Sequence, residues 1–347
     1  MFNKIKVRPI QILITSAGVV LISLVLNFTV VAQAAKDNLR PAALGKNGMI
    51  ATANPLATLA GQKILVKGGN AIDAIVAAAA SLNAAEPYMS GTAGVGYMLF
   101  YSAKENRVRS LVFGGWVPET FRITKFKTDV KVADGAGHGA MESIGPRIAS
   151  VPGNLAGWAK ALKDYGTMSL SEVFESAIDY LENGVPITEF DQAMWAGTVK
   201  RIAPHAESRK IFFKNDKDPF VIGDYFSNKP LAITMRRIAN EGIDVFYKGE
   251  IAKEMAAAFA RDGGFITEKD LASVPDKVQW VDPISINYRG YKVYNNPPPG
   301  MGIQQLQTLK IMEGFDVKKM GHNSVDYLAH LMEAVNLSRI DSDKYIG

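Results

Sequence analysis

The chain has 347 residues, of which 48% are hydrophobic and 21% charged, and it carries a formal net charge of +5 at pH 7. This composition excludes an intrinsically disordered protein, because it supplies enough apolar side chains for a folded core. The sequence contains no cysteine, which excludes a fold held together by disulfides.

The first 34 residues are typical of a secretory signal. Residues 10–31 carry no charge, and Ala32-Gln33-Ala34 places small residues at alternate positions before an expected cleavage site. The apolar run is also long enough to span a bilayer, so an uncleaved membrane anchor is the alternative. Either interpretation predicts that residues 35–347 act outside the cytoplasm, in the periplasm or the extracellular space.

The positive charge is partly a feature of this leader. Its basic start consists of Lys4, Lys6 and Arg8, and residues 1–34 contain no acid, so the rest of the chain is close to neutral. No motif for RNA or DNA binding is present. We therefore expect no nucleic-acid partner, and a membrane contact only through an N-terminal anchor.

The next predicted elements are a short strand at 49–53 and two helices. The first helix is expected at about 56–67, because Asn54-Pro55 precedes it and two glycines follow it. Asn70 is expected to cap the second helix, and Asp73 favours the dipole at its N-terminus. The second helix is so rich in alanine that we expect it to be buried between other layers.

A glycine-rich loop at 90–97 follows this helix, and Glu86 lies between the two. The Glu86 carboxylate is expected either to bind backbone amides of the loop or to position a ligand. The loop leads into a predicted β-hairpin with strands at 97–103 and 108–113, which are rich in aromatic and β-branched residues.

Gly114, Gly115 and Trp116 follow the second strand of this hairpin. Glycines at a strand end let a ligand approach the backbone closely, but they also occur in plain turns. The residues alone leave both interpretations open.

The rest of the chain is predicted to be mainly helical, after an irregular segment at 121–150. Ser169 and Glu172 form a capping-box pattern at the start of a helix that ends near Asn183-Gly184. The other predicted elements are a helix beginning at 151–153, a mainly helical stretch at 190–262, a capped turn at Thr267 and Asp270, a hairpin at 283–296, a rigid break at 297–299, and helices at 303–314 and 324–338.

Common catalytic and metal-binding signatures are absent from the sequence. It contains no G-x-S-x-G, H-E-x-x-H or G-x-x-x-x-G-K-[ST] pattern. A metal site needs clustered ligands, and the four histidines are scattered along the chain. We expect neither a metal ion nor another cofactor.

Several stretches, taken together and in order, resemble the γ-glutamyltranspeptidase family. They include "GGNAIDAIVAAAASLNAAEPYMSGTAGVGYMLF", "SVPGNLAGWAKALKDYGTMSLSEVFESAIDYLENGVPIT" and "YRGYKVYNNPPPGMGIQQLQTLKIMEGFD". The matching stretches lie at 48–101, 150–188, 238–259, 263–274, 288–316 and 321–334. The resemblance thus covers nearly all of residues 48–347.

The resemblance implies an α/β (α+β) architecture, the four-layer αββα fold of the N-terminal-nucleophile hydrolases. Members of the family cut their own precursor in front of a Thr, which then attacks an amide carbon and passes the acyl group to water or to an amine. A Thr hydroxyl needs a base, and an α-amine with a pKa of about 7.7–8.0 can serve as one. No histidine is required for this chemistry.

The resemblance further implies that residues 35–347 are the large-subunit portion of such a precursor, truncated at its C-terminus. The nucleophilic Thr would lie beyond Gly347, so no catalytic residue is expected in this chain. The expected partners are a small subunit that carries the Thr and a small-molecule amide or peptide substrate. Alone, the chain is expected to be inactive and to lack half of the central sheets.

Two departures from the family pattern bear on the identity of the substrate. The family's "R-E-x-A-P" motif places its carboxylate-binding Arg on Gly114 and its Glu on Gly115, and Arg122 lies too far along the chain to be assigned that role. We therefore take Gly114, Gly115 and Trp116 as the candidate substrate-binding residues. The sequence "PPPGMG", in place of the family's usual "PPPSSGG", is closer to acylase and amidohydrolase members.

Three functions are left open by the resemblance. The default is an enzyme that acts on γ-glutamyl compounds such as glutathione. The first alternative is an acylase or amidohydrolase of the same superfamily with a different acyl group. The second is a binding remnant without catalytic activity.

Overall fold

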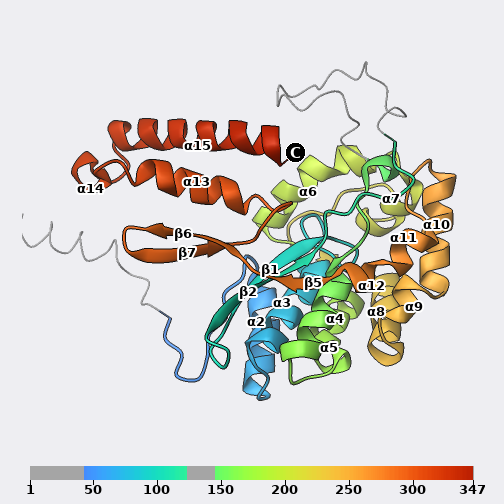
Figure 1. Cartoon of the computed structure of the whole chain (residues 1–347). Helices are drawn as coiled ribbons and strands as arrows, with labels where there is room; N and C mark the ends of the chain where they lie inside the picture. Colours follow the sequence, from blue (N-terminus) through green and yellow to red (C-terminus); the bar gives the residue numbers. More distant parts are fainter. Residues whose placement is uncertain (1–42, 123–144, 347) are drawn as a thin grey trace, which may run out of the picture. The chain divides into compact units, whose positions relative to one another are not determined.

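The computed structural model describes residues 43–122 and 145–346 (Figure 1). The chain divides after Met49, and all the described helices and strands lie in the unit Ile50–Gly347. The signal or anchor expected at 1–34 and most of the irregular segment expected at 121–150 lie outside the described residues. No helix in the described part of the chain has both the length and the hydropathy needed to cross a membrane.

The first half of the described elements includes the predicted hairpin, β1 and β2. They are α2 (Pro55–Val66), α3 (Ala71–Ala85), β1 (Gly96–Ser102), β2 (Arg107–Phe113), the short 3₁₀ helix η2 (Pro146–Ile148), α4 (Asn154–Tyr165), α5 (Leu170–Asn183), β3 (Val185–Pro186), α6 (Glu189–Ile202), α7 (Ala206–Phe212) and β4 (Tyr225–Phe226).

The second half begins with helices and ends with a hairpin and a helix pair. It consists of α8 (Lys229–Glu241), α9 (Asp244–Tyr247), α10 (Glu250–Arg261), α11 (Glu268–Ala272), α12 (Val274–Lys277), β5 (Gln279–Val281), β6 (Ile284–Tyr288), β7 (Tyr291–Asn295), α13 (Gly302–Met312), α14 (Val317–Met320) and α15 (Val325–Tyr345). The predicted hairpin at 283–296 and the two helices after it are thereby confirmed.

Local capping chemistry starts the helices where the sequence predicts. Asn70 Oδ1 accepts hydrogen bonds from the amides of Ile72 and Asp73, and the Asp73 carboxylate accepts one from the Asn70 amide. The same reciprocal arrangement joins Ser169 to Glu172 at the start of α5. These boxes satisfy amides that have no partner inside the helix.

The strand predicted at 49–53 is wrong. The segment pairs with no described strand, and a strand needs a neighbour to bind its backbone groups. Thr52 Oγ1 instead donates to the Asn54 carbonyl at 2.7 Å and lies 2.7 Å from Thr58 Oγ1. The segment therefore forms the approach to α2.

The main sheet is antiparallel, in the order β1-β2-β5. The confirmed hairpin pairs Gly96 with Phe113 at one end and Ser102 with Arg107 at the other. Strand β5, which the sequence does not predict, pairs with β2 over three residues. Leu111 and Phe113 of β2 face the core, whereas Leu99 and Tyr101 of β1 are exposed.

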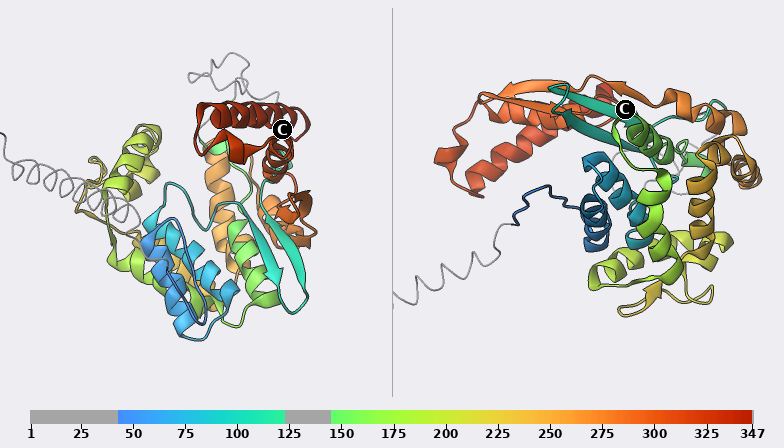
Figure 2. Two further views of the ribbon diagram at one scale, coloured as in Figure 1. Left: turned by 90° about the vertical axis from the view of Figure 1, so that its left-hand side faces the viewer. Right: turned by 90° about the horizontal axis from the view of Figure 1, so that it is seen from below.

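Helices form a layered core on one side of this sheet. The alanine-rich α3 packs between α2 and α5, and it is buried along most of its length, as predicted. Helix α4 packs against β2, and α8 packs against α5 (Figure 2). The pair α13 and α15 lies side by side next to the β6–β7 hairpin. Short alanine side chains let these layers approach closely, since they add little width to a helix.

Candidate substrate-binding site

The three residues taken from the sequence as candidate site residues follow β2 directly. Gly114 is buried, Gly115 is exposed with φ +82°, and Trp116 is half-buried against the core. The Trp116 carbonyl accepts a hydrogen bond of 3.0 Å from the Val151 amide, which ties this strand exit to the approach of α4. The positive φ of Gly115 is a conformation that L side chains rarely adopt.

Gly114 is enclosed by the glycine-rich loop. A Cβ atom built on Gly114 would lie 2.8 Å from Val95 Cγ1 and 2.9 Å from Val95 Cα. A side chain of any size, including that of an Arg, therefore does not fit there unless Val95 and its loop move. The absence of a side chain at Gly114 leaves room for Val95, and because Gly114 is buried it offers no surface to a ligand.

Gly115 faces a different set of neighbours. A Cβ atom on Gly115 would lie 3.0 Å from Pro299 Cγ and 3.6 Å from the Tyr97 hydroxyl. A Cβ atom on Gly300 would in turn lie 3.4 Å from the Tyr97 ring. The exit of β2, the start of β1 and the loop before α13 thus converge around one exposed glycine.

The glycine-rich loop is fixed by the N-terminus of α4. The Gly94 carbonyl accepts hydrogen bonds from the amides of Gly153 at 2.8 Å and Asn154 at 2.9 Å. The Asn154 side chain also donates to the Gly91 carbonyl at 2.7 Å. Because the first amides of a helix lack partners within it, the loop caps α4 while α4 holds the loop in place.

A second tether holds the middle of the loop. Asn83 Oδ1, on the last turn of α3, accepts hydrogen bonds from the Thr92 amide at 2.8 Å and the Thr92 hydroxyl at 3.1 Å. Asn83 and Thr92 are both buried. The loop that encloses Gly114 is therefore tied to both α3 and α4.

Glu86 acts on the loop through its backbone. Its carbonyl accepts hydrogen bonds from the Met89 amide at 2.9 Å and the Ser90 amide at 3.0 Å. Its carboxylate binds none of the amides in the described loop, so the expectation that the side chain would do so is wrong. The residue is only 7% exposed, and it ends α3.

The cations near the sheet are engaged elsewhere. Arg122 donates to the carbonyls of Glu119 at 2.8 Å and Phe121 at 2.7 Å. Arg109 forms an ion pair of 2.9 Å with Glu105, at the far end of the hairpin. Neither guanidinium is among the nearest neighbours of Gly115, which belong to Pro299 and Tyr97.

The Tyr97 hydroxyl supplies the polar group at this point. It has no hydrogen-bond partner among the described residues, and burial raises its pKa above the ordinary value. The phenol therefore stays protonated and neutral at physiological pH. Tyr97, Pro299 and Gly300 are absent from the sequence-based site; the only signal for them was the glycine-rich loop beside Tyr97 and the "PPPGMG" motif.

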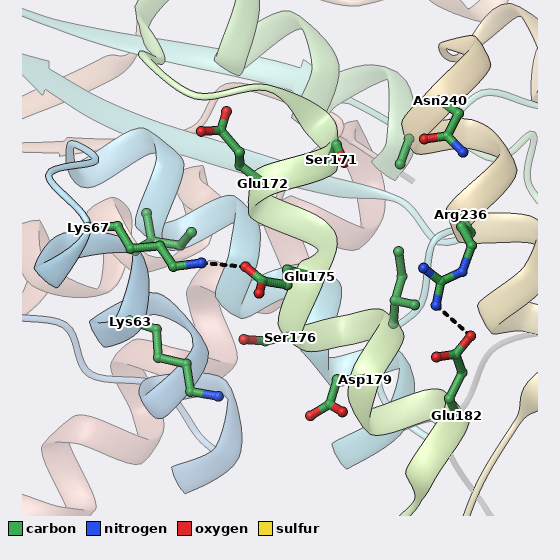
Figure 3. Close-up of a pocket in the computed structure, with 13 residues that line it drawn as sticks. Lys63, Lys67, Ser171, Glu172, Glu175, Ser176, Asp179, Glu182, Arg236 and Asn240 are labelled. Atoms are coloured by element: carbon green, nitrogen blue, oxygen red, sulfur yellow. Dashed lines mark hydrogen bonds and ion pairs between the residues drawn. The ribbon is translucent and has the colours of Figure 1, made fainter.

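A groove of about 600 Å³ lies elsewhere, between α2, α5 and α8 (Figure 3). Its charged walls neutralise each other, because Lys67 pairs with Glu175 and Arg236 pairs with Glu182 at 2.6 Å. These side chains are partly exposed to solvent, which weakens each pair. The groove shares no lining residue with the strand exit, and its acids and bases are those of a solvated helix surface.

The described residues contain no cluster of possible metal ligands. Within 43–122 and 145–346, no three His, Cys, Asp or Glu side chains gather in a way that could hold an ion. His330, for example, bonds the Asp326 carbonyl one turn back along its own helix, at 2.8 Å.

Comparison with known proteins assigns the chain to a family. The family model described as Gamma-glutamyltranspeptidase matches residues 57–347. The chain belongs to the γ-glutamyltranspeptidase family. The resemblance seen in the sequence is thereby confirmed, as is the N-terminal-nucleophile hydrolase type of fold.

Individual relatives agree with this assignment. The chain is 35% identical to the glutathione hydrolase proenzyme of Escherichia coli over 306 residues, which is 87% of this chain and 51% of that protein. It superimposes on the γ-glutamyltranspeptidase of Helicobacter pylori with a TM-score of 0.79 and 32% identity, covering 88% of this chain and 86% of that one. A cephalosporin acylase from Bacillus halodurans gives a TM-score of 0.77 and 30% identity, over 89% of this chain and 57% of that one.

The length of the match matters for function. The chain spans about half the length of the curated relatives it matches. Those relatives are named as proenzymes, some as glutathione hydrolases and some as acylases.

Proposed function

We propose that this chain is the large-subunit part of a self-processing amidase of the γ-glutamyltranspeptidase family. The complete enzyme hydrolyses or transfers the acyl group of an amide through an N-terminal Thr on a small subunit. The observation that carries the proposal is the match of residues 57–347 to the family model, together with coverage of only half of each proenzyme relative. The nucleophile would then lie in the other half.

The large subunit's role in this scheme is to shape the acyl pocket. Gly115 and Trp116 would form part of the wall, and the glycine-rich loop beside them is held in place by hydrogen bonds to α3 and α4. Rigid walls keep the reacting carbonyl in place at small entropic cost. No step of the chemistry is assigned to a side chain of this chain.

The proposed location is outside the cytoplasm, in the periplasm or at the cell surface. The support is the basic start followed by the uncharged residues 10–31. An enzyme at that location meets peptides and small amides from the surroundings, and it folds without disulfides.

A second candidate substrate is favoured by one structural observation. Val95 encloses Gly114, so the position where the family motif would place a carboxylate-binding Arg has no room for one. γ-Glutamyl compounds remain the default by family, but an acylase that acts on an uncharged acyl chain fits this strand exit better.

Substrate preference tests this point on the processed product of the complete gene. We expect kcat/KM for γ-glutamyl 4-nitroanilide to be about ten- to a hundredfold below that for glutaramoyl 4-nitroanilide. An α-carboxylate held in the pocket without a cation is left unsatisfied, which costs about 1–3 kcal/mol, and 1.4 kcal/mol is about tenfold. A precursor whose self-cleavage is blocked serves as the blank. A clear preference for the γ-glutamyl substrate would restore the default and refute the argument from Gly114.

A further inference from the structure

We infer that the Tyr97 hydroxyl binds an uncharged oxygen on the acyl chain of the substrate. The inference rests on the proposed function and narrows its substrate class to acyl amides with a neutral hydrogen-bond acceptor. It starts from the position of Tyr97, which faces the one exposed backbone position of the strand exit.

Three segments fix the phenol at that place. Tyr97 is the second residue of β1 and pairs with Val112 of β2. Its hydroxyl lies 3.6 Å from the position that a Cβ of Gly115 would take, and its ring lies 3.4 Å from the corresponding position of Gly300. Any side chain at Gly115 would cover the hydroxyl, so the glycine keeps it open.

The hydroxyl lacks a partner within the protein. Tyr88 donates to Asp191 and Tyr165 donates to Glu105, whereas no described group bonds the hydroxyl of Tyr97. The hydroxyl is also reached by solvent. Among the described residues, the side-chain polar atom that is both fully buried and without a partner is Gln307 Oε1, so the unpaired Tyr97 hydroxyl is not fully buried. A half-buried hydroxyl that has no partner in the protein and is accessible from outside can form a hydrogen bond with a ligand.

The charges around the hydroxyl decide the kind of oxygen it binds. Arg122 bonds two backbone carbonyls and Arg109 pairs with Glu105. The described atoms nearest to the Cβ position of Gly115 belong to Pro299 and Tyr97, so no cation is among its nearest neighbours. Placing a carboxylate in a half-buried site without a cation is costly, whereas a carbonyl oxygen needs only the donor that the phenol provides. The chemistry therefore favours a carboxamide or ketone oxygen over a carboxylate.

Three anilides whose acyl chains have the same number of carbons distinguish a neutral acceptor, a carboxylate and an apolar group at the end of the acyl chain. Glutaramoyl 4-nitroanilide ends in a neutral carboxamide, glutaryl 4-nitroanilide ends in a carboxylate, and pentanoyl 4-nitroanilide ends in a methyl group. On the processed product of the complete gene, we expect kcat/KM to be highest for the glutaramoyl substrate. A wild-type ratio of glutaramoyl to pentanoyl hydrolysis at or below one overturns the inference without any variant.

The variant Y97F tests the hydroxyl directly. We expect it to lower the glutaramoyl-to-pentanoyl ratio of kcat/KM by about tenfold, with most of the change in KM. The control is Y101F on the same strand, because Tyr101 is 58% exposed and its hydroxyl donates to Asn106 at 2.9 Å. Y101F should leave the ratio unchanged.

Two results would overturn the inference, and a third separates it from the proposed function. Equal losses for both substrates in Y97F, or no loss for either, would show that the hydroxyl does not bind the acyl chain. A processed protein that cleaves no anilide would refute the proposed amidase function instead. In that case calorimetry measures how tightly wild type and Y97F bind the uncleaved anilides. The ratio of glutaramoyl to pentanoyl affinity in the two proteins then decides the inference.

Discussion

Replacing Gly153 by Ala is expected to lower the free energy of unfolding by about 3 kcal/mol or more. A Cβ at this position would lie 2.6 Å from the backbone carbon of Phe113, nearer still to its carbonyl oxygen, and 3.1 Å from the Trp116 ring. Backbone atoms cannot rotate away, so either the end of β2 or the start of α4 must move. The shift would strain the Gly153–Gly94 hydrogen bond as well as the packing.

The matched control is Gly197→Ala, in the interior of α6. Gly197 is exposed, and nothing lies within 4 Å of the position of its Cβ. An alanine there should stabilise the helix by up to about 1 kcal/mol, because alanine has the higher helix propensity. Thermal unfolding of both purified variants gives the comparison. Similar losses in the two variants would show that the steric account of Gly153 is wrong.

Replacing Asp73 by Ala is expected to cost about 3 kcal/mol. Asp73 has no exposed surface, and its carboxylate accepts hydrogen bonds from the amides of Asn70, Thr167 and Met168 and from the Thr167 hydroxyl, at 2.6–3.1 Å. It therefore joins the start of α3 to the turn before α5. Alanine leaves several partly buried donors without a partner, and each fully buried donor would cost about 1–3 kcal/mol, with partial relief from solvent here.

Glu172→Ala is the control for this variant, because Glu172 holds the same place in an exposed capping box. Its loss should cost about 1 kcal/mol, the usual contribution of a cap. Urea unfolding of both variants measures the difference. Equal costs would contradict the view that Asp73 links two elements of the core.

The same carboxylate predicts how stability depends on pH. Burial acts to raise the pKa of Asp73, but the hydrogen bonds from Thr167, Asn70 and Met168 outweigh it and hold the pKa below the ordinary value. The unfolded chain therefore binds this proton more tightly than the folded one. The stabilisation is present above a pH of about 4 and is lost as the pH falls through the lower folded pKa. An Asp73→Asn variant should lose this part of the acid sensitivity.

Rules that act over a few residues predicted much of the fold. The capping boxes at Asn70 and Ser169 start α3 and α5, and aromatic and β-branched content placed the β1–β2 hairpin. Each depends on groups within a few positions along the chain, so the sequence contains the whole interaction. The alanine content of α3 likewise predicted its burial.

Elements that depend on distant partners could not be predicted. The segment 49–53 has the residues of a strand but pairs with no strand in the described part of the chain, whereas the three-residue β5 pairs with β2. The candidate site follows the same rule. Tyr97 belongs to it only because Gly115 and Pro299, distant in sequence, lie next to its hydroxyl.

The central claim is that this chain is one part of a self-processing amidase, and mass spectrometry of the purified product of the complete gene tests it most directly. The account predicts two chains, the larger containing residues 48–347 and the smaller beginning with Thr. It also predicts that replacing that Thr by Ala leaves one uncut precursor. A wild-type product that stays a single intact chain under native conditions, or a gene with no continuation and no partner subunit, would contradict the account.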